Sequence, residues 1–418
     1  MRTVICLFTL FFIFNPFIAD ADEMVSVKLV NYIKETSKIN IKIKGNYETL
    51  SPTLQLEEGV NYTLYTKRGQ LYLTRAGEDT NKLGDNLILI PQTYDKTHLV
   101  YINDRAYLGA MEFTIEDKKH IRPINHLQLE EYLKGVVPFE VYPTWNMEAL
   151  KAQSLAARTY AITQLNQNMD DTIRFQVYGG YEEKFNRTTK AVEETKGEII
   201  TFSGKPITAF YSASNGGMTE SNENVWGGKR RSYFPIKQDP FDPVNPWEFT
   251  LHKRQIQLGP IDLVTPLHWN KLQEKDKQIS NSIKNWLRKK GYGSQIKIIR
   301  IPHFNISTKD KTEGKRSTKG SITIDFMYQF FGFVLFDSIE LKDVPLSRIR
   351  PMIGGTLFKS YLIDSFQESE QLYKVTGRGY GHGVGMSQWG AHYMAETGKN
   401  YKEIIDFYYP GTQITKLY

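Results

Sequence analysis

Five glycines at alternating positions, from Gly377 to Gly385, restrict what the C-terminal part of this chain can fold into. If the run is extended, the side chains of Arg378, Tyr380 and His382 lie on one face and bare backbone lies on the other. Bare backbone allows a ligand or another chain segment to approach closely. The run is not a phosphate loop, since the Gly-Lys-Ser/Thr ending is absent, and its spacing does not match a dinucleotide-binding loop. His382 is therefore a candidate functional residue, with a structural turn as the alternative.

The N-terminal part of the chain is predicted to form short strands. Apolar residues alternate with polar ones at 25–29, 39–43 and 62–64, which is typical of half-buried strands. Gly45-Asn46, Glu58-Gly59 and Arg68-Gly69 indicate turns between them. We expect a small β-rich module over residues 22–110, and it holds no cluster of catalytic residue types.

Residues 111–418 are predicted to form a mixed domain. A helix is expected from Asn146, which is a good N-cap with Glu148 in the first turn, to about Gln167. Strands are expected at 197–201, 207–212, 295–301 and 321–327. An amphipathic helix over about 267–290 marks residues 251–298 as a helical insertion. The expected fold class is therefore α+β.

The last two expected helices have clear ends. The first starts near Ser387 and ends at Gly398, a residue suited to the position after a helix. The second starts with Asn400 and Glu403, which match a capping box, and closes at Pro410-Gly411.

The first residues indicate export. Arg2 precedes an apolar run over residues 4–14, and Ala19-Asp20-Ala21 matches an A-x-A cleavage site. We expect residues 1–21 to be a signal peptide. An uncleaved anchor is the alternative, because Phe17 and Ile18 lengthen the apolar stretch.

Cysteine content and charge limit the function further. The only cysteine is Cys6, inside the expected signal peptide, so the mature chain has no disulfide, thiolate metal site or cysteine nucleophile. Export without disulfides is typical of a bacterial envelope protein. The net charge of +7 favours anionic partners, although a solvated basic surface is the alternative. The sequence shows no basic stripe or motif for nucleic-acid binding.

Glu140 is the candidate catalytic residue. Its neighbours over 136–143 are all apolar, and burial among them raises the pKa of a carboxyl because desolvation disfavours the charged form. Pro138 and Pro143 on either side predict a loop or an extended segment. A glutamic acid that keeps its proton near neutral pH can protonate the leaving oxygen of a glycosidic bond. The alternative is an exposed loop carboxylate without a function.

Two mechanisms remain open for Glu140. Asp239 or Asp242 could fold in as the second carboxylate of an ordinary glycosidase, although neither is close in sequence. With one carboxylate, the acid protonates the bridging oxygen and then, as a base, takes the proton of the sugar's own 6-hydroxyl. That hydroxyl closes on the anomeric carbon and gives a 1,6-anhydro sugar without water.

Metal and serine chemistry are not indicated. His382 and His392 lie ten residues apart, but zinc without cysteine needs three His, Asp or Glu ligands, and no H-E-x-x-H or similar cluster occurs. The Gly-x-Ser-x-Gly elbow of serine hydrolases is also absent. We expect no metal and no cofactor.

Four segments, in this order, resemble the SpoIID/LytB family. They are Leu133-Lys-Gly-Val-Val-Pro-Phe-Glu140, Met147-Glu-Ala-Leu-Lys-Ala-Gln-Ser-Leu-Ala-Ala-Arg-Thr-Tyr160, Tyr211-Ser-Ala-Ser-Asn-Gly-Gly-Met-Thr-Glu220, and Gly377-Arg-Gly-Tyr-Gly-His-Gly-Val-Gly-Met-Ser-Gln-Trp-Gly-Ala391 with Tyr408-Tyr-Pro-Gly411. The resemblance covers about residues 110–418, and its last segment is very specific. It implies a mixed α+β fold unlike that of lysozyme-like transglycosylases.

The resemblance implies roles for named residues. Proteins that resemble SpoIID are lytic transglycosylases that cut glycan strands stripped of stem peptides during engulfment in sporulation. The family's catalytic glutamate falls on Glu140, its important arginine on Arg158 and its tyrosine on Tyr233. The residues expected to bind or line the substrate are Arg158, Tyr233, His382, Lys237 and Gln153.

The chain departs from the family pattern at two points. The family's lysine, two places after its tyrosine, falls on Pro235, and Lys237 is displaced. Some relatives bind zinc through a histidine and a cysteine in the segment that matches residues 211–217. Neither residue type occurs in that segment here, so the resemblance implies a site without metal.

Two functions follow from the resemblance. The first is a peptidoglycan lytic transglycosylase that leaves 1,6-anhydro-muramic ends, in sporulation or wall remodelling. The second, from the LytB branch, is a wall-binding protein without catalysis that enhances an N-acetylmuramoyl-L-alanine amidase. The expected partners are glycan strands, a wall amidase and membrane-anchored engulfment proteins, with no nucleic acid. The expected location is the cell wall or the outer face of the cytoplasmic membrane.

Overall fold

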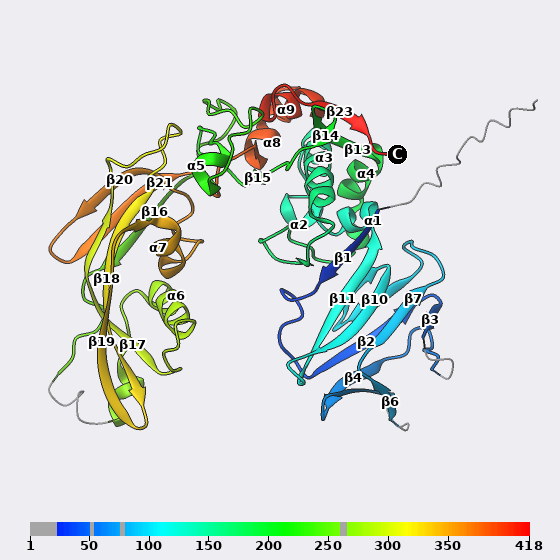
Figure 1. The fold of residues 1–418 in the computed structure, drawn as a ribbon, viewed down its shortest axis with the longest axis horizontal. Coiled ribbons are helices and arrows are strands. Elements are labelled where there is room, and N and C mark those ends of the chain that lie inside the picture. Colours follow the sequence, from blue (N-terminus) through cyan, green and yellow to red (C-terminus); the bar gives the residue numbers. More distant parts are fainter. Residues whose placement is uncertain (1–22, 51–53, 76–79, 260–265) are drawn as a thin grey trace, which may run out of the picture. The chain divides into compact units, whose positions relative to one another are not determined.

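The computed structural model describes residues 23–50, 54–75, 80–259 and 266–418, and Figure 1 shows its ribbon. The expected signal peptide, with Cys6, lies outside the described residues. Both helices and strands are present, which confirms the α+β class. Among the described helices, none combines the length and the apolar character that a membrane span requires. The described residues divide into two compact units, one with those of 23–132, 168–175 and 417–418 and one with those of 133–167 and 176–416.

Two six-stranded sheets form the first unit. The first sheet has the order β12-β1-β11-β10-β7-β3, with β1 (Met24–Lys28), β3 (Tyr47–Thr49), β7 (Leu87–Pro91), β10 (Ala110–Glu116), β11 (His120–Gln128) and β12 (Met169–Asp170). The second has the order β6-β5-β4-β2-β8-β9, with β2 (Lys38–Lys44), β4 (Tyr62–Lys67), β5 (Gln70–Arg75), β6 (Asn81–Gly84), β8 (Leu99–Ile102) and β9 (Arg105–Leu108). Alternate residues of β1 and β2 are buried, as the sequence pattern predicted.

The first unit extends beyond the expected boundary at residue 110. β10 pairs with β7, and β11 pairs with β1, so both strands complete the first sheet. β12 also joins this sheet, in a parallel pair in which Val27 lies opposite Met169. These partner strands are distant in sequence, and the alternation of apolar and polar residues within a strand carries no information about which strand it pairs with.

Helices and a small sheet surround Glu140 in the second unit. The helices are α1 (Leu129–Lys134), α2 (Val137–Glu140), α3 (Met147–Gln164), α4 (Asn186–Glu194), α5 (Asn222–Trp226), α8 (Gln388–Glu396) and α9 (Tyr401–Tyr408), with a 3₁₀ turn at Glu183–Phe185. The boundary between the two units falls within α1. The strands are β13 (Glu198–Phe202), β14 (Lys205–Pro206) and β23 (Gln413–Lys416) in one sheet, and β15 (Tyr211–Ser212) paired with β22 (Met386–Ser387).

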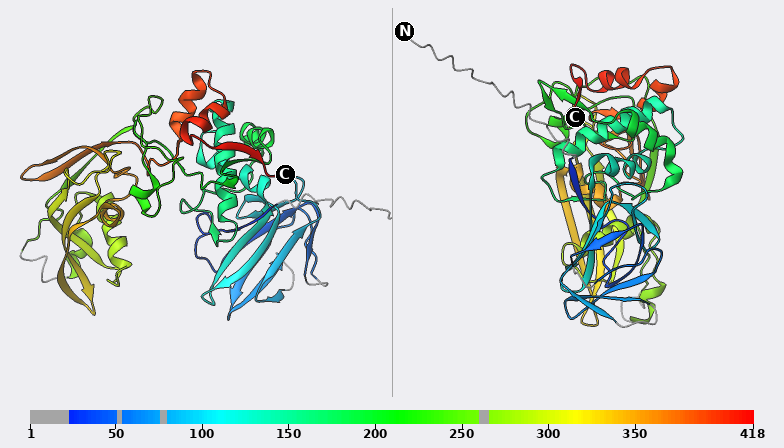
Figure 2. Two further views of the ribbon diagram at one scale, coloured as in Figure 1. Left: turned by 45° about the horizontal axis from the view of Figure 1, so that its top comes forward. Right: turned by 90° about the vertical axis from the view of Figure 1, so that its right-hand side faces the viewer.

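The long helix α3 is the centre of this part. It packs against α4, α8 and α9, as Figures 1 and 2 show. Its buried alanines allow this close packing: they are Ala149, Ala152, Ala156, Ala157 and Ala161. The Asn146 side chain accepts a hydrogen bond from the Glu148 backbone N at 3.0 Å, which confirms the expected N-cap. The capping box of Asn400 and Glu403 is confirmed as well.

The remaining part of the second unit is mostly β-structure. One sheet has the order β16-β21-β20, with β16 (Pro246–His252), β20 (Leu362–Glu368) and β21 (Leu372–Arg378), and the other has the order β17-β18-β19, with β17 (Ile296–Ile306), β18 (Lys319–Phe330) and β19 (Phe333–Pro345). The helices are α6 (Lys277–Arg288) and α7 (Leu346–Ile353), with a 3₁₀ helix at Pro266–Lys271. Extra structure therefore continues well beyond the expected insertion at 251–298.

Helix α6 is shorter than the predicted helix over 267–290. The Asp276 carboxylate, directly before α6, accepts hydrogen bonds from the His252 backbone N at 2.7 Å and from Gln255 Nε2 at 2.6 Å. These contacts fix the chain before the helix in a non-helical conformation. The apolar stripe of α6 is buried in the core of this part, as expected, with Ile279, Ile283 and Leu287.

The alternating glycine run is extended only as far as Arg378. Strand β21 ends at Arg378, and every following glycine up to Gly385 has a positive φ, between 71° and 119°. A Cβ at Gly383 would collide with the guanidinium of Arg316, and one at Gly385 would collide with the carbonyl of Phe210. The bare backbone therefore receives other segments of the same chain.

Candidate active site

Glu140 is the last residue of α2 and not part of a loop. The expectation was wrong because Pro138 occupies the first turn of this short helix, where a backbone N–H has no helical partner to lose. The chain becomes extended immediately afterwards, at Val141. The helix end places the carboxyl against the segment around Val177.

The Glu140 carboxyl has two neutral donors. Its Oε1 accepts a hydrogen bond from the Val177 backbone N at 2.7 Å, and its Oε2 lies 3.5 Å from Nε2 of Gln388. Burial raises the pKa of Glu140 to about 7, and these two hydrogen bonds oppose the rise. Val136, Val137 and Val141 are all buried beside it. A carboxyl in this setting exchanges its proton near neutral pH.

Gln388 connects Glu140 to helix α3. It is the first residue of α8 and directly follows the N-cap residue Ser387. Its Nε2 lies 3.4 Å from Oε1 of Gln153. Gln153 is only 1% exposed, and its Nε2 has no hydrogen-bond partner within the part of the chain that the structure describes. An unpaired buried donor is costly unless a ligand or water satisfies it. Gln153 thus supplies an available donor next to the Glu140 network.

Residue types alone did not identify Gln388 or Val177 as neighbours of Glu140. Gln388 belongs to the Met-Ser-Gln-Trp part of the C-terminal motif, so its place in that motif was the available signal. Val177 contributes only its backbone N, which no residue pattern can indicate.

A row of aromatic rings begins beside the carboxyl; we name it the first aromatic row (Tyr160, Phe210, Trp226 and His382). The charge of Glu140 contributes to the raised pKa of Tyr160, after burial, so the two groups are close. The Phe210 ring centroid lies 6.0 Å from that of Tyr160 and 4.4 Å from that of Trp226. The row continues to His382, whose ring centroid is 4.9 Å from that of Trp226.

His382 is a neutral ring in this row. Its Nδ1 accepts a hydrogen bond from the Val384 backbone N at 3.0 Å. Burial, helped by the charges of Arg316 and Arg350, lowers the pKa of His382 to about 4. The structure thus links His382 to Glu140 through Phe210 and Tyr160, and at neutral pH it offers a ring and not a positive charge.

A second group of rings follows Glu140 and Gln388 in sequence; we name it the second aromatic row (Tyr142, Trp145, Trp389, His392 and Tyr393). Trp389 is its centre, with ring centroids at 4.9 Å from Trp145, 5.9 Å from Tyr142 and 6.1 Å from Tyr393. His392 stacks on Trp145 at 4.6 Å. Tyr142 and Tyr393 are exposed. Rings from two distant motifs therefore form one apolar surface.

Arg158 is placed differently from the expectation. It is 0% exposed, and its guanidinium donates to the Val192 carbonyl at 3.0 Å, to the Glu198 carbonyl at 3.3 Å and to Thr195 Oγ1 at 3.3 Å. These contacts fasten α3 to the end of α4 and the start of β13. They favour a structural role over contact with a substrate, because acceptors within the fold already engage the guanidinium.

Tyr233 and Lys237 also lie in packed surroundings. Tyr233 belongs to a buried core cluster, with its ring 5.3 Å from that of Phe202. Lys237 Nζ donates to the Phe407 carbonyl at 2.5 Å and lies 3.5 Å from the centroid of that ring. These contacts hold the segment around residues 233–237 on α9. They favour packing roles for both residues over roles as glycan ligands.

Asp239 and Asp242 form a hydrogen-bonded latch, which we name the aspartate latch. Asp242 accepts hydrogen bonds from Ser214 Oγ at 2.8 Å, the Asn215 backbone N at 2.9 Å and Ser387 Oγ at 2.6 Å. Asp239 accepts from Asn215 Nδ2 at 2.7 Å and from the Tyr408 hydroxyl at 2.8 Å. Both residues are buried. Their lone pairs are used within the fold, which leaves little capacity for substrate chemistry.

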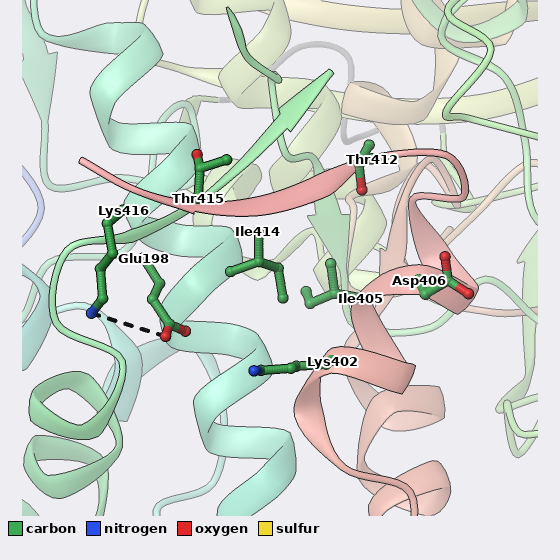
Figure 3. A pocket seen from close by; sticks show the side chains of 8 residues that line it. All are labelled: Glu198, Lys402, Ile405, Asp406, Thr412, Ile414, Thr415 and Lys416. Atoms are coloured by element: carbon green, nitrogen blue, oxygen red, sulfur yellow. Dashed lines mark ion pairs between the residues drawn. The ribbon is translucent and has the colours of Figure 1, made fainter. Parts of the chain in front are cut away.

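A pocket of about 340 Å³ lies elsewhere in the unit, between β13, β23 and α9 (Figure 3). Its rim carries charged side chains, with Lys416 Nζ 3.9 Å from Glu198 Oε1. Glu140 and the other predicted site residues do not line it. Within the described residues, no group of three or more His, Cys, Asp or Glu side chains is arranged to hold a metal ion.

Comparisons with known proteins agree with the motifs. The family model described as stage II sporulation protein matches residues 117–202. An amidase enhancer of Bacillus subtilis (strain 168) is 38% identical over 390 residues, which are 92% of this chain and 54% of that protein, so the chain spans about half of its length. Stage II sporulation protein D of the same organism is 29% identical over 314 residues, 70% of this chain and 76% of that protein.

A third relative matches over nearly all of both chains. An uncharacterized protein of Brachyspira hyodysenteriae is 30% identical over 385 residues, which are 90% of this chain and 89% of that protein. This match includes both the β-rich first unit and the unit that carries Glu140. The chain therefore belongs to the SpoIID/LytB family.

Proposed function

We propose that this protein remodels the bacterial cell wall by cutting peptidoglycan glycan strands as a lytic transglycosylase, with Glu140 as general acid and then base. The observation that carries this proposal is the Glu140 carboxyl, which is held by two neutral donors and whose pKa burial raises to about 7. A group with this pKa is present in both protonation states at neutral pH, which suits proton transfer in both directions.

The proton balance closes on Glu140 alone. The protonated carboxyl gives its proton to the glycosidic oxygen as the bond between that oxygen and the anomeric carbon breaks. The resulting carboxylate then takes the proton of the sugar's 6-hydroxyl, whose oxygen bonds to the anomeric carbon. The product is a 1,6-anhydro end, and Glu140 regains the proton that it donated.

The aspartate latch supports the mechanism with one carboxylate. An ordinary glycosidase needs a second carboxyl free to act as nucleophile or base. Asp239 and Asp242, the candidates from the sequence, are saturated by hydrogen bonds from Asn215, Tyr408 and Ser387. Ring closure by the substrate's own hydroxyl needs no such group.

The two aromatic rows support a sugar polymer as substrate. Sugar rings present apolar C–H faces that pack on aromatic side chains, while their hydroxyls need polar partners. Exposed rings occur in both rows, with Trp226 in the first and Tyr142 in the second. The unpaired Nε2 of Gln153 supplies a donor beside the carboxyl. Gln153 and His382 are the expected substrate residues that this arrangement supports best.

A second candidate function is stimulation of an N-acetylmuramoyl-L-alanine amidase without catalysis. The relative that covers 92% of this chain carries the name amidase enhancer, which favours this alternative. Under either function, we propose an exported protein at the cell wall or at the outer face of the cytoplasmic membrane. The proposed partners are glycan strands, a wall amidase and, in sporulation, membrane-anchored engulfment proteins.

Product analysis separates the two functions. The protein would be incubated with glycan strands that lack stem peptides, and the ends would be identified by mass spectrometry. The proposal predicts 1,6-anhydro-muramic ends with the native chain and with Glu370→Gln, a control at an exposed carboxylate, and none with Glu140→Gln. Ordinary reducing ends would indicate a hydrolase. Intact strands together with a faster amidase would establish the enhancer function instead.

A further inference from the structure

The hairpin of β18 and β19 ends in an unusual aromatic tip. Phe330 pairs with Phe333 across the strands, and Phe331 and Gly332 form the turn between them. The three phenylalanines are 55%, 72% and 85% exposed for Phe330, Phe333 and Phe331. Soluble proteins rarely present such a cluster of large apolar side chains to water without an interaction partner.

The backbone conformation of this turn disfavours Phe331, which occupies its first position. Phe331 has a φ of 46° and Gly332 a φ of 83°, the pattern of a two-residue turn with both residues left-handed. Such turns favour Asn, Asp or Gly, and a bulky residue there is strained. The chain thus keeps an aromatic ring where both the backbone and the solvent favour a polar side chain. Strained residues of this kind often serve a function.

The apolar surface is confined to the tip of the hairpin. Leu335 and Phe336 extend the apolar surface a short way along β19. Charged residues occupy the strand from there on, with Asp337, Glu340 and Lys342. Charged side chains on an edge strand prevent pairing with a strand of another protein. The tip is therefore suited to insertion of side chains and not to extension of the sheet.

A basic run lies close to the same hairpin. Arg288, Lys289 and Lys290 follow one another at the end of α6, and all are exposed. Tyr292, two residues on, fixes this run to the hairpin: its ring centroid is 5.3 Å from that of Tyr328, and its hydroxyl donates to Asp337 Oδ2 at 2.7 Å. Phe331 lies three positions after Tyr328, so the tip extends about 10 Å beyond this contact at ~3.3 Å per residue.

We propose that this hairpin docks the protein on the surface of a bilayer that contains anionic lipid. Aromatic side chains insert about 5–10 Å deep at the boundary between headgroups and acyl chains, which matches the reach of the tip. The basic run then lies near the lipid phosphates, which attract Lys and Arg. This combination of an apolar tip with adjacent positive charge favours a membrane over a protein partner or a second copy of the chain. The inference is independent of the chemistry at Glu140.

Vesicle sedimentation tests the proposal with the full chain. The native protein is expected to bind vesicles of phosphatidylglycerol and phosphatidylcholine, and to bind pure phosphatidylcholine at least roughly tenfold more weakly. Phe331→Asn with Phe333→Ser should reduce binding to the mixed vesicles by a similar factor. Ile173→Ser, which removes another apolar side chain that is 88% exposed, should leave binding unchanged. Lys289→Glu with Lys290→Glu should abolish the preference for anionic lipid.

Thermal unfolding distinguishes loss of docking from loss of folding. Phe331→Asn should raise the melting temperature slightly, because Asn adopts the left-handed conformation more readily, while vesicle binding falls. Three results would overturn the proposal: no binding of the native chain to anionic vesicles, equal binding by the Phe331→Asn/Phe333→Ser variant, or a dimer in sedimentation velocity that the same variant dissolves. The last result would assign the tip to self-association.

Discussion

Glu140 and the aspartate latch are two acidic sites in the same unit, and they differ in how their carboxyls are satisfied. Asp242 accepts hydrogen bonds from Ser214, Asn215, Val244 and Ser387 at 2.6–2.9 Å. Glu140 accepts one short bond from the Val177 backbone N and one long contact from Gln388. Donors from the fold occupy both oxygens of Asp242, whereas Oε2 of Glu140 has only the long contact, which leaves it able to hold a proton. Burial alone therefore does not distinguish a structural carboxyl from a reactive one.

The two sites are also connected. Ser387 donates to Asp242 Oδ2 and caps the N-terminus of α8, and Gln388 is the next residue. The aspartate latch thus fixes the helix end from which Gln388 reaches Glu140. Under the proposed function, the latch holds the helix end in place and Glu140 performs the chemistry. The following changes test this division, from the largest expected effect to the smallest.

Replacing the reactive carboxyl should remove activity and leave the fold intact. Glu140→Gln keeps the size of the side chain but cannot transfer a proton, so glycan cleavage should fall by roughly 10³-fold, within the range for general acid–base groups. Circular dichroism and urea unfolding should show a native fold. A variant that retains more than a tenth of the native rate would remove Glu140 from the mechanism.

Replacing a latch carboxyl should lower the stability of the fold, which Glu140→Gln leaves intact. Asp242→Asn turns an acceptor of several buried donors into a poorer one, so the free energy of unfolding should fall by about 3 kcal/mol. Urea unfolding measures this loss, with Asp406→Asn, an exposed aspartate on α9, as the control. If Asp242→Asn were as stable as the native chain but inactive, the aspartate would belong to the chemistry.

The pKa of Glu140 should make stability depend on pH. Because burial raises this pKa from 4.5 to about 7, the folded state holds a proton that the unfolded state has released between these values. Stability of the native chain therefore declines as pH rises through this window. Glu140→Gln lacks the effect, so at pH 8 it should exceed the native chain in free energy of unfolding by about 3 kcal/mol, at ~1.4 kcal/mol per pKa unit. At pH 4 the difference should vanish.

Replacing Gln388 should have a smaller effect, and this effect should be on activity. Gln388→Ala removes the contact that opposes the raised pKa of Glu140, so the rate should drop roughly tenfold and its pH profile should move to higher pH. The pH dependence of kcat/KM measures both, with Gln367→Ala, an exposed glutamine on β20, as the control. A lower rate with an unmoved profile would mean that Gln388 only supports the fold.

Local sequence patterns predicted the starts of α3 and α9 and the raised pKa of Glu140. Asn146 and Asn400 cap their helices as expected, because capping depends on residues within one turn. The apolar neighbours of Glu140 indicated its raised pKa for the same reason. The family resemblance placed Arg158 and Tyr233 among the substrate residues, whereas their buried contacts favour packing roles.

Features that depend on distant partners were not predictable. The alternating glycines turn in left-handed conformations because Arg316 and Phe210 lie against them, and both come from other parts of the chain. Gln388 reaches Glu140 across 248 positions of sequence. No spacing rule covers such contacts, since they arise only when α8 packs on α3.

Titration of the Glu140 carboxyl is the most direct test of its role. The protonated carbonyl band of one glutamic acid can be followed by infrared difference spectroscopy between the native chain and Glu140→Gln over a range of pH. The expected midpoint is about 7, with the band fully present in mildly acidic solution. A midpoint near the ordinary value of 4.5 would mean that Glu140 is ionised at neutral pH, and it would contradict its role as the acid.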